Sequence, residues 1–355
     1  MKTFDIIPPN EVIRPDLARK IDNLAKPRGS LGRLEELALR VGLIQQSLNP
    51  ALCSPENILF AGDHGLLAEG ISPTPREVTW QQTLHFTQGT GTGIGFLCHQ
   101  HGFHLRVVDA GVDYDFPSGC GVIDRKVRRG TSNCLYGPAM STDELDRCLV
   151  SGAGVVDAAA ADGCNVVSFG EMGAGNTSPS ALWMHCLAGV PLPECIGAGS
   201  GLDDAGWQHK FEVLTRAAEN FERDGWNGFD GTPAAARLAM ARFGGFEMAM
   251  AVGGMLRAAE LGMVILVDGF IMTACILAAS RLHPAVLHYA IFAHVGDECG
   301  HRRLLGELGA DPILSLGLRL GEGSGAVCAY PIVDSAVRMI GEMESFASSN
   351  VTKYF

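Results

Sequence analysis

Short apolar runs recur along the chain, and each is followed by small or acidic residues and then by a segment with helical spacing. Because strand, polar turn and helix follow one another repeatedly, the pattern predicts a parallel α/β sheet. The expected strands lie at residues 57–60, 105–108, 165–169, 195–196 and 264–267. Ligands bind beyond the carboxyl ends of the strands in such sheets, so the polar turns at those ends are expected to form the functional site.

Both ends of the chain show a helical pattern. Residues 1–25 are expected to form a helix that ends at the KPRGS turn, and Ser30 is expected to cap the next helix, 31–46. The last segment with apolar periodicity, 326–345, predicts a helix that packs against an apolar surface.

No sequence repeat and no Ser- or Pro-rich linker divides the chain. The two helical ends are expected to pack together as a small helical subdomain of residues 1–25 and 326–355. Residues 26–325 are then expected to form one large α/β catalytic domain.

One stretch has nearly the length and apolar character of a membrane span, residues 261–280 (LGMVILVDGFIMTACILAAS). Asp268 lies in its middle, where a carboxylate would cost about 3 kcal/mol on insertion scales. A buried strand at 263–267, a turn at Asp268 and Gly269, and a buried helix explain the pattern better. We therefore expect a protein that makes no contact with a membrane.

The composition narrows the class of protein further. Glycine accounts for 45 of the 355 residues, near twice its usual share of about 7%, and follows no fixed period. The glycines are therefore expected where the backbone turns sharply or approaches a ligand. The net charge of −12, from 27 Lys and Arg against 39 Asp and Glu, argues against a nucleic-acid partner but permits a pocket for a small anion.

The eleven cysteines are scattered, odd in number and free of C-x-x-C spacing. The first five residues already include charged side chains, and no apolar core of a signal peptide follows them. Reduced and mostly buried thiols in a cytoplasmic protein are therefore a better interpretation than a disulfide framework.

Several segments resemble known motifs without matching them. Residues 89–95 (GTGTGIG) fit no register of G-x-G-x-x-G and follow a helical segment rather than a strand. The G-S-G sequences at 199–201 and 323–325 lack the G-x-S-x-G nucleophile elbow. The histidines at 99–104 have no Cys or acid at ligand spacing and are interpreted as a solvated loop, so no metal site is expected.

Two glycine-rich segments predict a phosphate site. Residues 170–178 (GEMGAGNTS) follow a strand and open a helix, so their backbone amides could surround a phosphate. Residues 197–201 (GAGSG) repeat this arrangement after the next expected strand, and Lys210 follows in a helix. Either segment alone could be an ordinary turn, but both at one sheet edge favour an anion site.

Three side chains at strand or helix ends are candidates for chemistry. Glu322, within RLGEGSG, could act as a general base if burial raises its pKa, or it could simply complement the dipole of the last helix. Asp268 could bind a ribose hydroxyl or orient a neighbour. His64, within AGDHG, could line the site or be a structural histidine.

These motifs stand in the order expected for the nicotinate-nucleotide–dimethylbenzimidazole phosphoribosyltransferase family, which the chain resembles over residues 20–350. The matching motifs are KPRGSLGRLE at 26–35, AGDHG at 61–65, GEMG at 170–173 with Asn176 and Thr177, VDGF at 267–270, and RLGEGSG at 319–325.

The resemblance implies a reaction in which nicotinate mononucleotide and 5,6-dimethylbenzimidazole give α-ribazole 5′-phosphate and nicotinate, with inversion at the anomeric carbon. The pyridinium of the nucleotide is already a cationic leaving group, so neither a metal nor a cofactor is expected. The resemblance also implies a Rossmann-like parallel sheet flanked by helices and a homodimer whose only other partners are these small molecules.

The resemblance assigns the catalytic base to Glu322 and places Glu171 close to the ribose. The expected contacts of the phosphate and ribose are Gly173, Gly175, Asn176, Gly199, Lys210 and Asp268. The expected residues of the acceptor-base pocket are Asp63, His64, Thr74, Met172, Leu320 and either Gln81 or Gln82.

Two departures from the family pattern leave the acceptor open. Arg28 stands where a second Pro is common, and Thr74 stands where some relatives have Ser. The acceptor could therefore be a phenol or adenine instead of a benzimidazole. A non-catalytic protein that binds the nucleotide or the base is a further alternative, although such a relative would have lost acids like Glu171 and Glu322, which are present here.

Overall fold

A six-stranded, fully parallel sheet forms the centre of the molecule in the computed structural model, which describes residues 3–353. The strands are β1 (Glu56–Gly62), β2 (His104–Gly111), β3 (Ile123–Asp124), β4 (Val166–Met172), β5 (Val264–Val267) and β6 (Ala290–Phe292). Their spatial order is β3-β2-β1-β4-β5-β6, so the direction of winding reverses between β1 and β4. This is the Rossmann order, in which ligands bind at the carboxyl ends next to the reversal. The expected fold class is confirmed.

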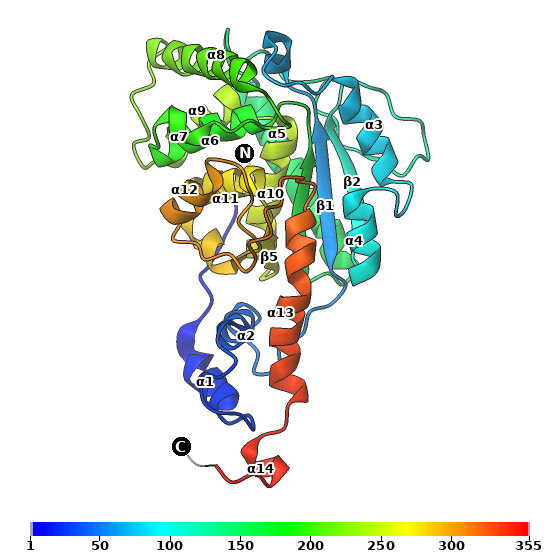
Figure 1. The fold of residues 1–355 in the computed structure, drawn as a ribbon, viewed down its shortest axis with the longest axis vertical. Coiled ribbons are helices and arrows are strands. Elements are labelled where there is room, and N and C mark those ends of the chain that lie inside the picture. The colour runs from blue at the N-terminus through cyan, green and yellow to red at the C-terminus, as the bar shows by residue number, and fades with distance from the viewer. Residues whose placement is uncertain (1–2, 354–355) are drawn as a thin grey trace.

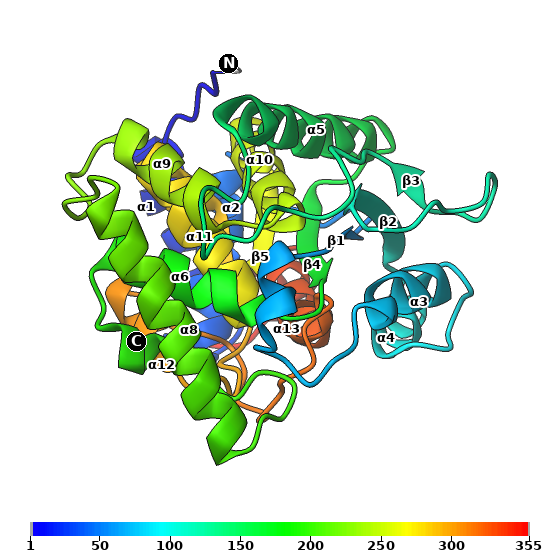
Figure 2. The same cartoon turned by 90° about the horizontal axis from the view of Figure 1, so that it is seen from above.

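Helices cover both faces of the sheet (Figure 1). Their bounds are α1 (Arg14–Asp22), α2 (Arg33–Ile44), α3 (Glu77–Phe86), α4 (Gly93–His101), α5 (Thr142–Ala161), α6 (Thr177–Ala188), α7 (Leu192–Cys195), α8 (Asp204–Arg223), α9 (Pro233–Phe243), α10 (Phe246–Glu260), α11 (Phe270–Leu282), α12 (His301–Glu307), α13 (Ser324–Glu342) and α14 (Phe346–Ser349), with 3-10 turns η1 (Glu11–Ile13), η2 (Gly65–Glu69) and η3 (Pro284–Tyr289). Helix α10, backed by α5, packs on one face, and α3, α4 and α13 pack on the other (Figure 2).

Four of the expected strands are confirmed by β1, β2, β4 and β5. The strand expected at 195–196 is wrong, because Cys195 ends the short helix α7, whose first turn contains a proline. Prolines favour the first turn of a helix and cannot donate to a strand ladder. Strands β3 and β6 were not expected, and each is at most three residues long.

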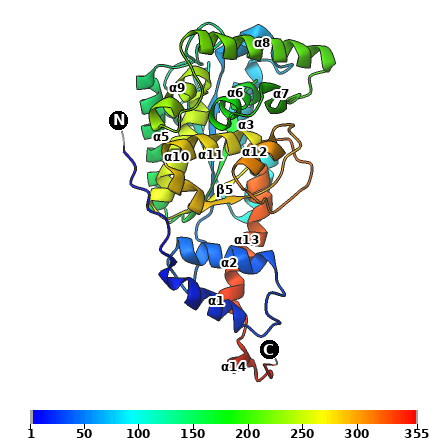
Figure 3. The same ribbon diagram turned by 90° about the vertical axis from the view of Figure 1, so that its left-hand side faces the viewer.

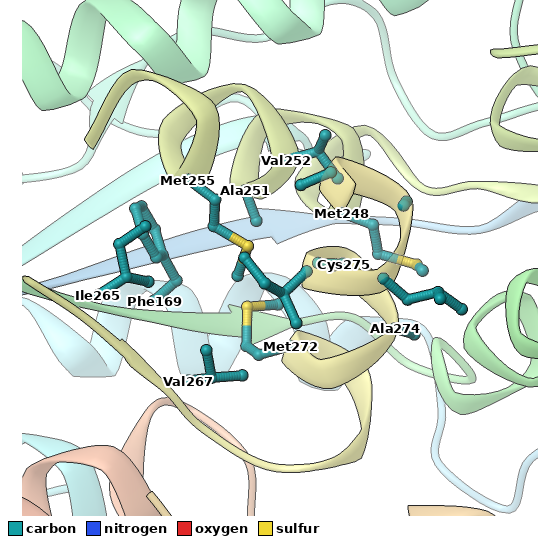
Figure 4. Close-up of a cluster of buried hydrophobic side chains, with 14 of the residues drawn as sticks. Phe169, Met248, Ala251, Val252, Met255, Ile265, Val267, Met272, Ala274 and Cys275 are labelled. Atoms are coloured by element: carbon teal, nitrogen blue, oxygen red, sulfur yellow. The ribbon is translucent and has the colours of Figure 1, made fainter. Parts of the chain in front are cut away.

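The core lies between the sheet and helices α10 and α11. Phe169 and Ile265 of the sheet face Met248 and Met255 of α10 and Cys275 of α11 (Figure 4). These side chains are fully buried, so the sheet edge that carries the polar turns rests on a rigid apolar layer.

The apolar stretch 261–280 folds as expected. It contains β5, a turn at Asp268 and Gly269, and the buried helix α11. Within residues 3–353, no helix combines the length and the apolar character that crossing a membrane requires.

Helices α1 and α2 lie beside the lower part of α13, below the sheet (Figures 1 and 3). The backbone N–H of Ala25 donates to Glu344 O at 2.8 Å, and that of Phe346 donates to Asn23 O at 3.0 Å. Helix α2 packs on both α1 and α13, so the expected boundary after residue 25 separates helices that pack together. Residues 1, 2, 354 and 355 of the expected subdomain lie outside the described residues.

Two local expectations at the N-terminal end are wrong. Helix α1 begins only at Arg14, and residues 3–10 have no regular structure, because this part carries Pro8 and Pro9. Ser30 does not cap the following helix, which starts two residues later than expected, at Arg33, with Gly32 at its N-cap.

Candidate active site

A cavity of about 190 Å³ opens at the carboxyl edge of the sheet, where the polar turns meet. Its walls come from the segments that follow β1, β4, β5 and β6, from the loop before α8, and from the loop before α13. The predicted site residues that line it are Thr74, Glu171, Met172, Gly173, Gly175, Asn176, Gly199, Lys210, Asp268, Leu320 and Glu322. Residues far apart in the sequence thus share one cavity.

Glu322 lies in this cavity in a left-handed backbone conformation, with φ of 66° between two glycines that also have positive φ. The amide of Asn57, within β1, donates to the Glu322 carbonyl oxygen at 3.1 Å. Gly170 of β4 lies so close to that carbonyl that any Cβ at position 170 would overlap it. A left-handed conformation costs about 1 kcal/mol or more for a residue with a side chain, so these contacts hold Glu322 in a geometry it would not adopt alone.

The electrostatic environment suits Glu322 to proton transfer. The residue is 9% exposed, and burial raises the pKa of its carboxyl to about 7, although a hydrogen bond from the Ile94 amide acts in the opposite direction. The negative charge of Asp268 also raises the pKa of Glu322. A carboxyl with a pKa near neutrality can accept a proton at physiological pH and release it afterwards.

Asp268 holds the loop that carries Glu322. Its carboxylate accepts the backbone N–H of Gly323 at 3.2 Å and that of Ala326 at 2.9 Å, at the start of α13. The structure therefore supports the expectation that Asp268 orients a neighbour.

Glu171 and Asn176 form a second polar pair in the cavity wall, in which the Asn176 amide donates to the Glu171 carboxyl. Burial raises the pKa of Glu171 to about 8 against the effect of that hydrogen bond, and the negative charges of Glu247, Asp268 and Glu322 add to the increase. At neutral pH Glu171 is therefore mostly protonated and can donate a hydrogen bond.

Lys210 brings a positive charge into the cavity wall although it is only 1% exposed. Its ammonium donates to Thr177 Oγ1 at 3.0 Å and to Gly197 O at 3.1 Å. Burial lowers the pKa of Lys210 to about 8, and the charge of Glu298 partly opposes this. No carboxylate of residues 3–353 forms an ion pair with this ammonium, so the site is suited to an anion from outside.

The loop 197–201 reaches the cavity, as expected, but by a different route. It follows α7 and not a strand, so the expected repetition of the strand-to-helix arrangement is wrong. Gly199 nevertheless lies beside Lys210, and Ser200 Oγ lies 2.8 Å from Thr74 Oγ1. The loop thus joins the side of the cavity that contains Lys210 to the side that contains Thr74.

Asp63 and His64 are not among the residues that line the cavity, and their contact with an acceptor stays a prediction. His64 Nε2 lies 2.8 Å from Glu247 Oε1, and Asp63 accepts the backbone N–H of Asp113 at 2.8 Å. Burial opposes protonation of His64, but the charge and hydrogen bond of Glu247 raise its pKa overall. Both residues therefore support the turn after β1.

Gln81 and Gln82 also lie outside the cavity wall. Helix α3 turns Thr79, Thr83 and Phe86 toward the sheet, which leaves Gln81 exposed and Gln82 half-buried. Which of the two glutamines faces the acceptor stays a prediction.

The histidines at 99–104 do not form the expected loop. His99 and His101 belong to the last turn of α4, and His104 begins β2. Within residues 3–353, no three His, Cys, Asp or Glu side chains gather closely enough to hold a metal ion.

Sequence patterns did not identify some residues that shape the site. Asn57 is a polar side chain inside a buried apolar strand, and this anomaly was a usable signal. Glu247 and His294 gave no signal, because their partners His64 and Asp268 are distant in the sequence. Ile94 acts through its backbone, which a sequence pattern does not reveal.

Comparison with known proteins identifies the class of enzyme. Residues 6–351 match the family model DBI_PRT, described as "Phosphoribosyltransferase", and the chain belongs to this family. The expected resemblance is confirmed.

Individual relatives support the assignment to this family. The chain is 58% identical over 355 residues to the nicotinate-nucleotide–dimethylbenzimidazole phosphoribosyltransferase of Bacteroides fragilis, with 100% of both chains covered. It is 47% identical over 352 residues to the enzyme of the same name from Dechloromonas aromatica, with 99% of both chains covered. The crystal structure of CobT from Thermus thermophilus is similar with a TM-score of 0.90 and 34% identity, covering 96% of this chain and 99% of that one.

Proposed function

We propose that this enzyme transfers the 5-phosphoribosyl group of nicotinate mononucleotide to 5,6-dimethylbenzimidazole, giving α-ribazole 5′-phosphate and nicotinate. The names of its relatives support both substrates. The observation that carries the proposal is one cavity that holds a carboxyl with a pKa of about 7, on Glu322, together with the buried ammonium of Lys210.

The nucleotide binds through its phosphate and ribose. Lys210 and the backbone around Gly173, Gly175 and Gly199 line the same cavity, so charge and main-chain amides together hold the 5′-phosphate. Glu171, which is mostly protonated at neutral pH, hydrogen-bonds the ribose.

The transfer requires one proton acceptor. The glycosidic bond breaks, and its electron pair moves to the pyridinium nitrogen. This atom becomes the neutral ring nitrogen of the nicotinate that leaves. A benzimidazole nitrogen donates its pair to the anomeric carbon from the opposite face, and the proton on the other ring nitrogen passes to Glu322. The enzyme contributes alignment of the two rings and a base already close to its working pKa.

The acceptor lies between Thr74, Met172 and Leu320. Met172 is half-buried and Leu320 is 56% exposed at the mouth of the cavity, so these side chains offer apolar contact to a flat ring. Phenols and adenine are alternative acceptors. Equimolar mixtures of benzimidazole, phenol and adenine, followed by identification of the α-nucleotides formed, will rank them.

Replacement of Glu322 tests the proposal directly. We expect Glu322→Gln to lower kcat by at least a thousandfold while nicotinate mononucleotide still binds, because the amide cannot accept the proton. Turnover is measured by nicotinate release, and binding by calorimetry. Glu342→Gln, the same change at the exposed far end of α13, is the matched control. Turnover close to wild type in Glu322→Gln would refute the assignment.

A protein that only binds the nucleotide or the base is the competing function. Release of nicotinate that depends on added acceptor, with one α-nucleotide formed per nicotinate, supports the transferase. Tight binding of nicotinate mononucleotide without any release supports the alternative.

Three further features belong to this proposal. The homodimer rests on the family resemblance, and sedimentation at several concentrations tests it. A cytoplasmic location is supported by the eleven cysteines, all of which are free. The division into residues 26–325 and a subdomain of the two chain ends, 1–25 and 326–355, is also proposed, and limited proteolysis tests it.

A further inference from the structure

The glycine run at residues 89–95, which is no dinucleotide motif, packs against the loop that carries Glu322. It forms the turn between α3 and α4, and α4 packs along α13. The backbone N–H of Ile94, in the first turn of α4, donates to Glu322 Oε2 at 3.4 Å. The start of one helix therefore meets the carboxyl proposed as the catalytic base.

The run is folded so that the start of α4 has a fixed position. Thr92 is the N-cap, and its hydroxyl accepts the Gly95 N–H at 3.1 Å. Gly95 in turn lies so close to the carbonyl of Gly89 that a Cβ at position 95 would overlap it. These contacts fix the direction in which the free N–H groups of the first turn point.

Gly93 leaves room for the active-site loop beside this turn. A Cβ at position 93 would lie 2.8 Å from Leu320 Cδ2 and 3.8 Å from Glu322 Oε2. The first turn of α4 is thus in direct contact with the motif that carries Glu322.

We propose that the first turn of α4 is a positioning element for Glu322, in which the Ile94 N–H orients the carboxyl and stabilises its ionised form. The catalytic consequence rests on the proposed function, because it requires Glu322 to be the base. Positive charge at the N-terminus of a helix favours an anion, and the Ile94 amide adds a directed hydrogen bond.

The other groups around Glu322 do not take this role. Asp268 at the end of β5 and Glu171 at the end of β4 are acids, and they disfavour a second negative charge. Arg319 of the same loop and His294 after β6 also line the cavity. Among residues 3–353, the hydrogen bond from Ile94 is the one found on the carboxylate of Glu322.

At 3.4 Å the bond is long, so it offsets only part of the pKa increase that burial causes. The pKa of Glu322 is therefore about 7. Without it, burial and the charge of Asp268 would raise the pKa of Glu322 further. The amide thus keeps the base available in the pH range in which it must accept a proton.

Two substitutions at position 94 isolate the amide. Ile94→Pro removes the N–H at a first-turn position, where proline is tolerated and where Gly93 before it has no Cβ to clash. Ile94→Ala keeps the N–H and loses side-chain packing similar to that lost in Ile94→Pro, so it is the matched control. We expect the pKa of Glu322 to rise by about one unit in Ile94→Pro relative to Ile94→Ala, which lowers kcat about tenfold on the acidic side of the profile.

A second pair at Thr92 covers the case in which Ile94→Pro does not fold. Thr92→Ala removes the N-cap hydroxyl and loosens the first turn, whereas Thr92→Ser keeps the hydroxyl. We expect a raised pKa for Glu322 in Thr92→Ala and a value close to wild type in Thr92→Ser.

Infrared titration of the substrate-free enzyme measures this pKa without turnover, with Glu322→Gln used to assign the carboxyl band. Equal pKa values in Ile94→Pro and Ile94→Ala, or in Thr92→Ala and Thr92→Ser, would overturn the inference. A shifted pKa in an enzyme whose Glu322→Gln variant stays active would uphold the positioning and refute the proposed function instead.

Discussion

Lys210 keeps its ammonium group in a position with almost no contact with water. Burial lowers the pKa of this group to about 8, so keeping its charge costs free energy in the substrate-free enzyme. A phosphate beside it would raise this pKa and stabilise the charged form. A buried charge of this kind fits the phosphate contact that we propose for Lys210.

Replacement of Lys210 by Met tests this view. Met fills a similar volume without charge, so we expect the dissociation constant of nicotinate mononucleotide to rise about 30- to 100-fold, as for loss of a charged hydrogen bond. Calorimetry measures the change. Wild-type affinity should also fall as the pH rises above about 8, whereas that of Lys210→Met should not follow this titration.

Urea denaturation supplies the control for Lys210→Met. The free energy of unfolding should stay equal or increase, because a buried charge is removed. Unchanged nucleotide affinity in a folded variant would contradict the proposed phosphate contact.

The sequence allowed prediction of Glu322, which stands between glycines just before a helix, and of Lys210, in the helix that follows the loop 197–201. It did not allow prediction of Glu247 or His294, because each acquires its role from a partner on another strand or helix. The pairing of His64 was not predictable for the same reason. Its ring pairs with Glu247, 183 residues away, on the first turn of α10.

At the scale of elements, helices α5 and α10 approach each other through glycines. A Cβ at Gly152 of α5 would overlap the carbonyl of Met250, and one at Gly253 of α10 would overlap that of Leu149. This close contact lets α10 lie flat between α5 and the sheet, and thereby fixes the apolar layer beneath the site.

Substitution by alanine at two glycines of α5 should therefore change the free energy of unfolding in opposite directions. We expect Gly152→Ala to lower the free energy of unfolding by about 3 kcal/mol through overpacking. Gly154 is exposed, with nothing within 4 Å of an added Cβ, so Gly154→Ala should raise that free energy by about 0.5–1 kcal/mol. Urea denaturation measures both, and equal effects would show that the helix contact has no such constraint.

Elements with a long apolar run were predictable, and short ones were not. The strand expected at 264–267 coincides with β5, because four buried residues end at an acid and a glycine. Strands β3 and β6 are too short to show any alternation, and only their neighbours in the sheet make them strands. The pair at 195–196 was misassigned because two apolar residues before a glycine run do not exclude a helical turn.

At the scale of the whole molecule, the cavity contains acidic side chains whose burial in the charged form lowers the stability of the fold. Glu171 and Glu322 both have a raised pKa, mainly because they are buried. Between about pH 4.5 and the folded-state values, the unfolded chain has lost these protons and the folded chain has kept them. Stability from these groups is therefore complete below that range and decreases as the pH rises through it.

The substrate-free enzyme should accordingly lose stability between about pH 5 and pH 8, by on the order of 3 kcal/mol for Glu171 alone. We expect Glu171→Gln to flatten this dependence, because the amide does not titrate and can still accept from Asn176. The measurement is the free energy of unfolding in urea across this pH range. The exposed Glu342→Gln serves as the control, and an unchanged slope in Glu171→Gln would contradict the buried-acid account.

The cavity wall contains a large share of bare main chain, including Gly173, Gly175 and Gly199. A codon change can replace a side chain, but it cannot remove a backbone amide at these positions without also adding bulk to the cavity. Under the proposed function, descendants of this gene therefore have little freedom to alter how the phosphate is held. Changes in acceptor must then come through Thr74, Met172 and Leu320, so a small library at these positions is the most direct route to an enzyme that accepts a different base.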